Sequence, residues 1–315
     1  MEAVLFKSMS DREFDVVALG EALIEFNQVQ SEPPMYLQGF GGDTSNAIIA
    51  AARAGARTAY LSRLGADRWA DQFMALWQAE GVDDRWVHRI PGQSTGIYFV
   101  HHDRQGHHFS YARAGSAASR MEPEDLRQGW RDAIAASQWL HVSGISLAIS
   151  QTARDTVLQA MSFARSVGTR VSLDTNLRLS LWPLDLARST LIEAMGLCDL
   201  MLPSLDDLVH LSGDARPEAN LDWCHQQGAD TVILKMGAQG AWVSHGNGRI
   251  LIEGRVVDAV DATGAGDCFC GNVLARLVHG DDLQKASHWA NLAASLSVQG
   301  HGAIVPMPRA DQGQA

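Results

Sequence analysis

The sequence lacks several features that would point to common classes of protein. Its 315 residues hold no apolar run of the roughly 18 residues that a membrane-spanning helix needs. The four cysteines have no CxxC spacing, which argues against a disulfide scaffold and favours buried free thiols. The first residues lack the basic segment and long apolar core of a signal peptide, so we expect a cytoplasmic protein.

Positive charge is also scarce. The chain has 25 Lys and Arg residues against 36 Asp and Glu residues, and its formal net charge is -11 at pH 7. This balance argues against sequence-independent binding of nucleic acids, which needs phosphate neutralisation by Lys and Arg. It leaves room for a small anionic ligand, because a few local arginines can reverse the sign within one site.

Short apolar runs alternate with helical runs along most of the chain. FDVVALG (14–20) is typical of a buried strand, and TSNAIIAAARAG (44–55) is typical of a helix that stops at a glycine. Two long helices are expected near the end, at 265–279 and 281–299. Apolar strands that follow glycine-ended helices indicate repeated βαβ units. We therefore predict an α/β fold with a mostly parallel central sheet.

One segment departs from this alternation. Residues 94–115 hold two runs of alternating β-branched and aromatic residues around a DRQG turn, which is typical of an antiparallel hairpin. A hairpin needs further strands for stability, and the β-rich stretch 22–42 can supply them. We predict a small β sheet that serves as a lid over the strand ends of the main domain. The main domain is expected to span 14–306, between flexible tails at 1–13 and 307–315.

The stretch DATGAGDCF (261–269) holds the first candidate catalytic residues. Glycines before a helix let the backbone approach a ligand, and the first N–H groups of a helix have no partner within it. Gly264, Ala265 and Gly266 therefore form a candidate phosphate cradle. Asp267 follows in the first helical turn, where the helix dipole favours its ionised form. Such a carboxylate can accept a proton from an alcohol that attacks the phosphate. A helix-capping aspartate after a glycine turn is the alternative.

This motif and its surroundings resemble a known family. DATGAGDCF resembles the C-terminal signature of the ribokinase-like (PfkB) sugar kinases. GFGGDTSNAIIAAARAG (39–55) and YLSRLGADRWADQF (60–73) resemble their N-terminal signature, and the resemblance extends from Val16 to Pro306. It implies a ribokinase-like three-layer α/β domain with a β lid, which uses ATP and Mg²⁺ to phosphorylate a sugar. It also implies a homodimer or higher homo-oligomer.

Within the family, the resemblance is greatest to the kinases of 2-keto-3-deoxygluconate. It rests on GEALIEF (20–26), GFGGDTSN (39–46), LHVSGISLAIS (140–150), SLDTNLRLSLW (172–182) and, more weakly, GAIVP (302–306). The implied reaction transfers the γ-phosphoryl group of ATP to the terminal hydroxyl of this sugar acid and gives 2-keto-3-deoxy-6-phosphogluconate. Three alternatives stay open: a fructokinase, a kinase of another keto-sugar acid, and a catalytically silent sensor of sugar acids or nucleotides.

The resemblance assigns roles to individual residues. Asp267 matches the catalytic base, and the anion hole is matched by Gly264, Ala265 and Gly266. The residues matched to contacts with sugar hydroxyls are Gly41, Gly42, Asp43 and Asn46. The residue types agree with these roles, because glycines allow close approach while Asp and Asn offer acceptors and donors to vicinal hydroxyls.

A sugar acid also needs a cation for its carboxylate, because guanidinium groups form charge-assisted hydrogen bonds with carboxylates. The resemblance assigns this role to Arg113 in SYARAGSA and to Arg178 in DTNLRLSLW. Tyr98 and Tyr111 are expected to face the sugar from the hairpin. Surface arginines without a ligand are the alternative for both positions.

The nucleotide and the ions are assigned to a further group of residues. LKMGAQGAW (234–242) matches the nucleotide loop of the family, and the implied nucleotide contacts are Asn176, Lys235, Gly237, Gly240 and Asn291. A plain β-turn is the alternative for this loop. Asp261 and Thr263 match a monovalent-cation site, which K⁺ would occupy.

The chain departs from the family pattern at two positions. Asp207 stands where many relatives have a glutamate that organises Mg²⁺ through water, so the charge is kept on a shorter side chain. His301 stands where some relatives have an acid that contacts the substrate. The resemblance therefore implies a role in magnesium binding for Asp207 and gives none to His301.

Overall fold

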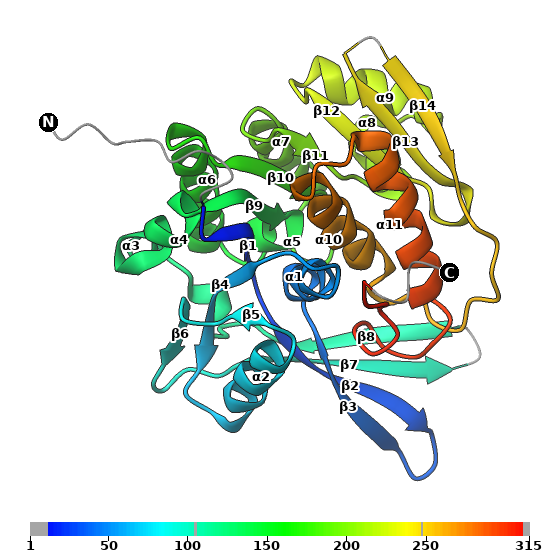
Figure 1. Ribbon diagram of the computed structural model, residues 1–315. Coiled ribbons are helices and arrows are strands. Elements are labelled where there is room, and N and C mark those ends of the chain that lie inside the picture. Colours follow the sequence, from blue (N-terminus) through cyan, green and yellow to red (C-terminus); the bar gives the residue numbers. More distant parts are fainter. Residues whose placement is uncertain (1–11, 104–105, 247, 311–315) are drawn as a thin grey trace, which may run out of the picture.

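The computed structural model describes residues 12–103, 106–246 and 248–310. The strands of its main sheet are Phe14–Leu19 (β1), Thr58–Gly65 (β4), Val82–Asp83 (β5), Val87–Ile90 (β6), Ser137–Ser143 (β9), Arg170–Asp174 (β10), Leu200–Met201 (β11), Thr231–Lys235 (β12), Gly240–His245 (β13) and Gly248–Glu253 (β14). Within the described residues this ten-stranded sheet has the order β14-β13-β12-β11-β10-β9-β1-β4-β5, with β6 paired to β4 (Figure 1). Neighbouring strands are parallel except at β13 and β14, which confirms the predicted mostly parallel sheet.

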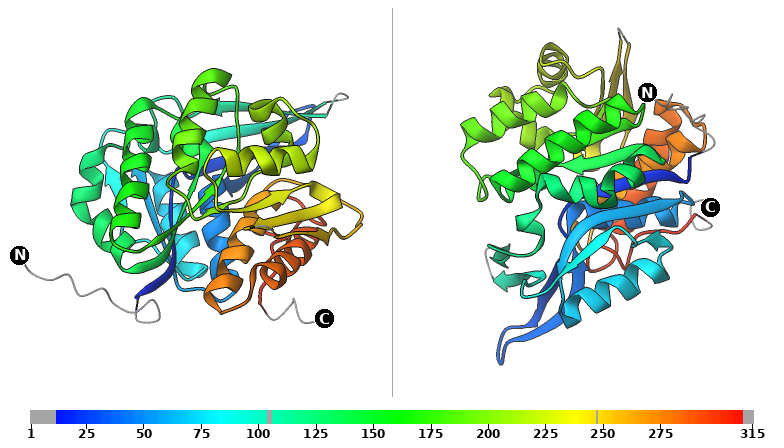
Figure 2. Two further views of the ribbon diagram at one scale, coloured as in Figure 1. Left: turned by 90° about the horizontal axis from the view of Figure 1, so that it is seen from above. Right: turned by 90° about the vertical axis from the view of Figure 1, so that its left-hand side faces the viewer.

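Helices cover both faces of this sheet (Figure 2). One face carries Asp43–Arg53 (α1), Arg68–Ala79 (α2), Ala265–Val278 (α10) and Leu283–Ser297 (α11). The other carries Pro123–Asp125 (α3), Arg131–Ala135 (α4), Gly144–Ala148 (α5), Gln151–Ser166 (α6), Leu184–Met195 (α7), Leu205–Ser212 (α8) and Pro217–Gln226 (α9). In β1, Val16 and Ala18 pack in one core, whereas Val17 and Leu19 pack in the other. Because successive side chains of a strand point to opposite faces, this alternation gives the predicted three layers.

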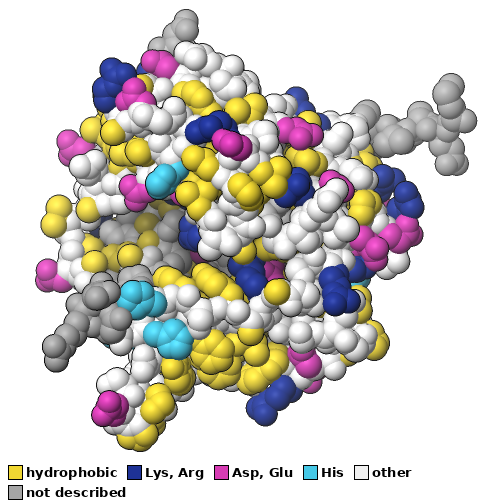
Figure 3. Space-filling view, turned by 180° about the vertical axis from the view of Figure 1, so that it is seen from behind, with side chains coloured by type: hydrophobic (Ala, Val, Ile, Leu, Met, Phe, Trp, Pro, Cys, Tyr) yellow, Lys and Arg dark blue, Asp and Glu magenta, His cyan; other side chains and the backbone are white. Residues whose placement is uncertain are grey.

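A second sheet comes from two separated pieces of chain. Its four strands are Leu23–Gln30 (β2), Met35–Gly41 (β3), Gly96–Asp103 (β7) and Gly106–Ala112 (β8), in the order β3-β2-β7-β8. The pair β7 and β8 is antiparallel, which confirms the predicted hairpin; part of its turn, 104–105, lies outside the described residues. One face of this sheet packs on α2 through Phe26 with Trp69 and Phe40 with Phe73. Beside the sheet the molecular surface is hollowed (Figure 3).

The two ends of the described chain are packed against the domain. Arg12 is buried, and its guanidinium donates to Thr169 Oγ1 at 2.6 Å. Met307 is buried, and Ala310 N donates to the Arg53 carbonyl oxygen at 2.9 Å. The packed part of the chain therefore reaches beyond 14–306 at both ends, while the rest of the predicted tails, 1–11 and 311–315, lies outside the described residues. Across the described part of the chain, no helix combines the length and apolarity that crossing a membrane requires.

Candidate active site

Two helices begin near one another at the strand ends. The first residue of α1 follows Gly42, whose φ is 105°, and the first residue of α10 follows Gly264, whose φ is 75°. Glycine adopts positive φ without the steric cost that other residues pay. Among the residues that the structure describes, no side chain caps either helix start with a hydrogen bond. Most of the first backbone N–H groups at both starts are therefore available to a ligand. Ala265 is an exception among the predicted anion-hole residues, because its N–H already donates to the Ala262 carbonyl oxygen at 3.2 Å.

Close packing of α1 and α10 brings these ends together. A Cβ atom on Gly271 would lie 2.1 Å from the carbonyl oxygen of Ala47, so only glycine allows the two helices to approach this closely. At their starts, Asn46 Nδ2 donates to Asp267 Oδ2 at 2.8 Å. A predicted sugar contact and the predicted base, 221 residues apart in the sequence, thus belong to one site.

The predicted anion hole lies at the start of α10, above a buried cation. Gly264 packs so closely on the C-terminal segment that a Cβ atom there would lie 2.9 Å from Ala303 Cβ. Lys235 Nζ lies 3.5 Å from the position that a Cβ atom would take on Gly266. Uncapped N–H groups and an ammonium group therefore converge where an anion would bind.

Lys235 keeps its charge through an ion pair that sequence reasoning missed. Its Nζ donates to Asp174 Oδ2 at 2.9 Å and contacts Cys270 Sγ at 3.4 Å. Burial disfavours the charged amine, but the charge and hydrogen bond of Asp174 together with the nearby Cys270 and Asp267 outweigh burial, so the pKa of Lys235 lies above its usual value. The available signal was the position of Asp174 at the end of a buried strand, in SLDTN.

The surroundings of Asp267 raise its pKa. Burial and then the nearby Asp43 carboxylate raise the pKa of Asp267 to about 7, and the hydrogen bond from Asn46 lowers it only in part. The position at the helix start predicts that the dipole favours the ionised form; desolvation and like charge act against the dipole and outweigh it, so the pKa is raised. A carboxyl group that titrates near neutral pH is well matched to general base catalysis.

Asp43 and Asn46 each present an unused acceptor to the site. Asn176 Nδ2 donates to Asp43 Oδ2 at 3.0 Å. Among the described residues, Asp43 Oδ1 and Asn46 Oδ1 are buried without a hydrogen-bond partner. A buried acceptor without a donor costs free energy, and the hydroxyl groups of a sugar would supply donors. These two residues therefore fit the predicted sugar contacts.

The two predicted arginines differ in their surroundings. Arg113 is buried and forms an ion pair with the buried carboxylate of Glu21, which also accepts a hydrogen bond from Ser116 Oγ at 2.7 Å. Arg178 is exposed, and its Nη1 donates to the Leu177 carbonyl oxygen at 2.9 Å. No carboxylate of the described chain lies within ion-pair distance of Arg178. The charge of Arg113 is thus largely balanced within the protein, whereas that of Arg178 is available.

Tyr98 and Tyr111 lie on the small sheet, as predicted, with different exposure. Tyr98 is buried, and its hydroxyl donates to the carboxylate of Glu25. Tyr111 is 45% exposed and stacks on Tyr98, with ring centroids 6.0 Å apart. Sequence reasoning missed Glu25 and Glu21, because Glu25 lies within a strand and Glu21 lies just before it, and neither pattern indicates a partner.

On the predicted nucleotide side, two residues have structural partners. Gly237 lies in an exposed turn before β13. A Cβ atom on Gly240 would lie 2.1 Å from the Ile252 carbonyl oxygen, and Asn291 Nδ2 donates to that same oxygen at 3.2 Å. Gly240 and Asn291 therefore shape the loop that follows β14. Contact of Gly237, Gly240 and Asn291 with a nucleotide stays a prediction.

The predicted ion ligands also have internal partners. Asp261 accepts from Thr263 Oγ1 at 2.6 Å and from Gly302 N at 2.9 Å, so it ties its loop to the C-terminal segment, where His301 is exposed. Burial alone would raise the pKa of Asp261, but these hydrogen bonds lower it. Asp207 Oδ2 accepts from Thr175 Oγ1 at 2.7 Å.

A divalent metal ion would have few ligands from the protein. In the part of the chain that the structure describes, no cluster of three His, Cys, Asp or Glu side chains could hold a metal ion. Mg²⁺ usually binds through one or two carboxylates together with phosphate oxygens and water. Asp207 is buried beside Asp174 and Lys235, close to the anion hole, so a metal that reaches the site with a phosphate ligand fits these residues.

These parts together define a class of protein. A titratable carboxylate, open N–H groups with a buried ammonium, and orphaned acceptors for hydroxyl groups are what transfer of a phosphoryl group to an alcohol requires. The sequence also matches the description "pfkB family carbohydrate kinase" over residues 13–310. The chain therefore belongs to the pfkB family of carbohydrate kinases, and the family predicted from the sequence is confirmed.

Individual relatives agree with this family. The chain is 34% identical to a 2-dehydro-3-deoxygluconokinase of Thermoproteus tenax, over 96% of this chain and 94% of the relative. It is 29% identical to a fructokinase of Vibrio alginolyticus, over 85% and 88% respectively. The crystal structure of a fructokinase from Vibrio cholerae with fructose, ADP and calcium bound has a TM-score of 0.85 and 28% identity, covering 95% of this chain and 97% of that one.

Proposed function

We propose that this protein transfers the γ-phosphoryl group of ATP to the terminal hydroxyl of 2-keto-3-deoxygluconate. The observation that carries the proposal is the contact of Asn46 with Asp267 beside the open start of α10. It supports the proposal because an amide that could bind a hydroxyl and a carboxylate that could accept a proton are in contact beside this helix start. The choice of substrate comes from the name of the T. tenax relative, 2-dehydro-3-deoxygluconokinase. 2-Dehydro-3-deoxygluconate and 2-keto-3-deoxygluconate are two names for the same compound.

The chemistry follows from the groups in place. The terminal hydroxyl gives its proton to Asp267 as its oxygen attacks the γ-phosphorus, and the bond from that phosphorus to the bridging oxygen of ADP breaks. The N–H groups of Gly264 and Gly266, together with Lys235, neutralise charge on the transferred group, while the Ala265 N–H is held by the Ala262 carbonyl oxygen. Asp207 would help to hold a magnesium ion that enters with the nucleotide, and the ion would neutralise phosphate charge. Asp261 and Thr263 would hold a K⁺ ion.

We place the reaction in the cytoplasm, where ATP is available, and a homodimer stays a prediction.

Arg178 supports an acidic substrate. Its guanidinium is exposed, and its charge acts to lower the pKa of Asp43, one of the predicted sugar contacts. No internal carboxylate balances it among the described residues, so a substrate carboxylate would gain a charge-assisted hydrogen bond there. We therefore assign binding of the substrate carboxylate mainly to Arg178. Arg113 could contribute only while it also keeps its ion pair with Glu21.

A fructokinase is the second candidate, and one observation favours it. The ion pair of Arg113 with Glu21 makes this corner of the site neutral, as an uncharged sugar would need. The fructokinase relatives cover nearly the same length of chain. The two candidates differ in one group of the substrate, its carboxylate, so they make opposite predictions for the arginines.

Turnover assays on a panel of acceptors test the proposal. ATP consumption would be measured with 2-keto-3-deoxygluconate, its galactonate epimer and fructose, for wild type and for Arg178→Ala. We expect the sugar acid to be the best substrate and R178A to lose about 100-fold in kcat/KM for the acid, since a charge-assisted hydrogen bond contributes about 1.5–3 kcal/mol. Equal losses with the acid and with fructose would contradict the assignment of Arg178. No ATP consumption with any acceptor would favour the silent sensor.

A further inference from the structure

The face of the small sheet toward the site is organised in cross-strand rows. Leu23 pairs with Gly41 and Gly96; two residues further along, Glu25 pairs with Gly39 and Tyr98. Tyr98 in turn pairs with Tyr111 across β7 and β8, which makes the second row Gly39, Glu25, Tyr98 and Tyr111. The shared face follows from the pairing, because directly opposite residues in a sheet project to the same side.

The glycines of β3 make room for this row. A Cβ atom on Gly41 would lie 2.5 Å from Tyr98 Oη, and one on Gly39 would lie 3.1 Å from Glu25 Oε1. The side chains of Tyr98 and Glu25 therefore occupy the space that side chains at positions 41 and 39 of β3 would otherwise fill. Because Gly41 directly precedes Gly42 and the start of α1, the Tyr98 hydroxyl lies at the edge of the site that holds Asp43 and Asn46.

The Tyr98 hydroxyl uses its one hydrogen in a bond within the protein. It donates to Glu25 Oε2, and both side chains are at least 94% buried, with exposed fractions of 6% and 3%. Burial, and next the Glu25 carboxylate, raise the pKa of Tyr98, so the hydroxyl keeps its proton. A hydroxyl has one hydrogen to donate and two lone pairs that accept. Toward any ligand, Tyr98 is then an acceptor.

We propose that Glu25 is a positioning residue that fixes the Tyr98 hydroxyl as a hydrogen-bond acceptor for one hydroxyl group of the sugar. This inference rests on the proposed function and deepens it. A carboxylate of the substrate has no hydrogen to donate at neutral pH, and it would meet the negative charge of Glu25 at this end of the site. The hydroxylated part of the substrate therefore faces Tyr98, and the carboxylate points away from the second row.

The proposal predicts a coupled effect of two substitutions. Kinetics would be measured with whichever acceptor the wild type phosphorylates, and with analogues that each lack one hydroxyl. Glu25→Ala and Tyr98→Phe should each raise KM for the full acceptor about tenfold, as loss of one oriented hydrogen bond does, and leave KM for ATP within about twofold. Both variants should lose the wild-type preference over one particular deoxy analogue. The double variant should be no worse than Y98F alone.

Two further variants separate positioning from a structural role. Glu25→Gln keeps an acceptor of the same shape and should restore most of the loss seen in E25A. Tyr36→Phe is the matched control, because Tyr36 is a tyrosine on the opposite face of the same sheet whose hydroxyl bonds His101 Nδ1 at 3.1 Å. Its KM for the acceptor should stay at the wild-type value.

Distinct outcomes would overturn the inference. Additive losses in the double variant, or a KM unchanged in E25A, would show that Glu25 does not act through Tyr98. So would an equal loss for the full acceptor and every deoxy analogue. If E25A does not fold, E25Q is measured alone with the deoxy analogues. A well-folded E25Q that no longer prefers the full acceptor over the particular deoxy analogue would contradict the proposal that an acceptor at position 25 orients the Tyr98 hydroxyl. Failure of the proposed function would be seen separately, as a wild type that phosphorylates no acceptor.

Discussion

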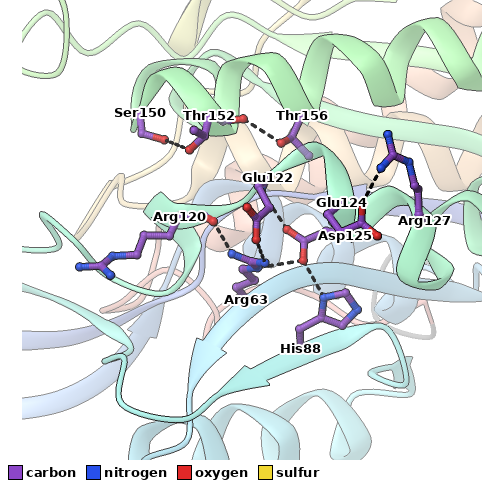
Figure 4. Close-up of polar contacts among 10 residues, drawn as sticks. All are labelled: Arg63, His88, Arg120, Glu122, Glu124, Asp125, Arg127, Ser150, Thr152 and Thr156. Carbon is purple, nitrogen blue, oxygen red and sulfur yellow. Dashed lines mark hydrogen bonds and ion pairs between the residues drawn. The ribbon is translucent and has the colours of Figure 1, made fainter.

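Asp125 and Asp267 occupy the same position in two different helices. Each is the third residue of its helix, α3 and α10 respectively. Asp125 is fully buried; its Oδ1 accepts from Arg63 Nε at 2.8 Å and contacts His88 Nδ1 at 2.9 Å, and its Oδ2 accepts from Glu122 N at 2.9 Å (Figure 4). Asp267 is half-buried, and among the described residues its carboxylate has one hydrogen bond, from the neutral amide of Asn46.

The difference lies in what surrounds the two carboxylates. Around Asp125, a guanidinium and a backbone N–H group satisfy both oxygens, and Glu122 and Asp125 close a capping box at the start of the helix. At Asp267, a bare glycine stands where the cap would be, and the nearest charges include Asp43. A carboxylate with complete partners holds a fold together, whereas one that lacks donors is ready to take a proton.

The largest effect should come from Asp267→Asn. An amide cannot accept the proton of the attacking hydroxyl, so kcat should fall by about 10³-fold, within the range for loss of a general base. Steady-state ATP consumption would measure it, and circular dichroism would check that the variant is folded. Turnover within tenfold of wild type would contradict the base assignment. Asp125→Asn offers the matched control, because it makes the same change at the same helix position outside the site.

Asp125→Ala should instead destabilise the fold. It leaves the guanidinium of Arg63, whose side chain is 9% exposed, without the partner at its Nε atom. Removal of one partner of a buried pair costs about 3–5 kcal/mol. Urea denaturation would measure the loss, with kcat of the folded fraction near the wild-type value. A variant as stable as wild type would show that Glu122 alone can balance Arg63.

The pH dependence of activity sharpens the comparison further. Because burial and Asp43 raise the pKa of Asp267 to about 7, kcat/KM should fall about tenfold per pH unit below that value. Asp43→Asn removes the like charge and should shift this acidic limb to lower pH. A pH profile of both proteins would measure the shift. An unchanged limb in D43N would assign the titration to another group.

The smallest effect concerns stability. A carboxyl group with a raised pKa stabilises the folded state below its unfolded pKa of 3.8, and this contribution is lost as pH rises toward 7. Wild type should therefore lose stability relative to Asp267→Asn between about pH 4 and pH 7. Unfolding free energies at pH 5 and pH 8 would measure the difference. If D267N gains nothing at pH 8, the pKa of Asp267 is not raised in the folded protein.

Much of this molecule was predictable because it depends on local patterns. The alternation of strands and helices, the hairpin at 94–115 and the glycine turn before Asp267 all follow from periodicity and from the special backbone freedom of glycine. Even Gly39 and Gly41 of GFGG (39–42) can be read as places where other atoms come close. The identity of those atoms, Tyr98 and Glu25, cannot be read in the same way.

The sequence by itself determined the layers, the strands of the small sheet and the residue types that phosphoryl transfer needs. Only the tertiary structure decided the charge state of the site: which carboxylate each cation balances, and which oxygens have no donor. Asp174 pairs with Lys235 across 61 positions, Glu21 takes Arg113, and Asp43 raises the pKa of Asp267. The physical reason is that propensity acts between neighbours in the chain, whereas electrostatics depends on distance and burial in space.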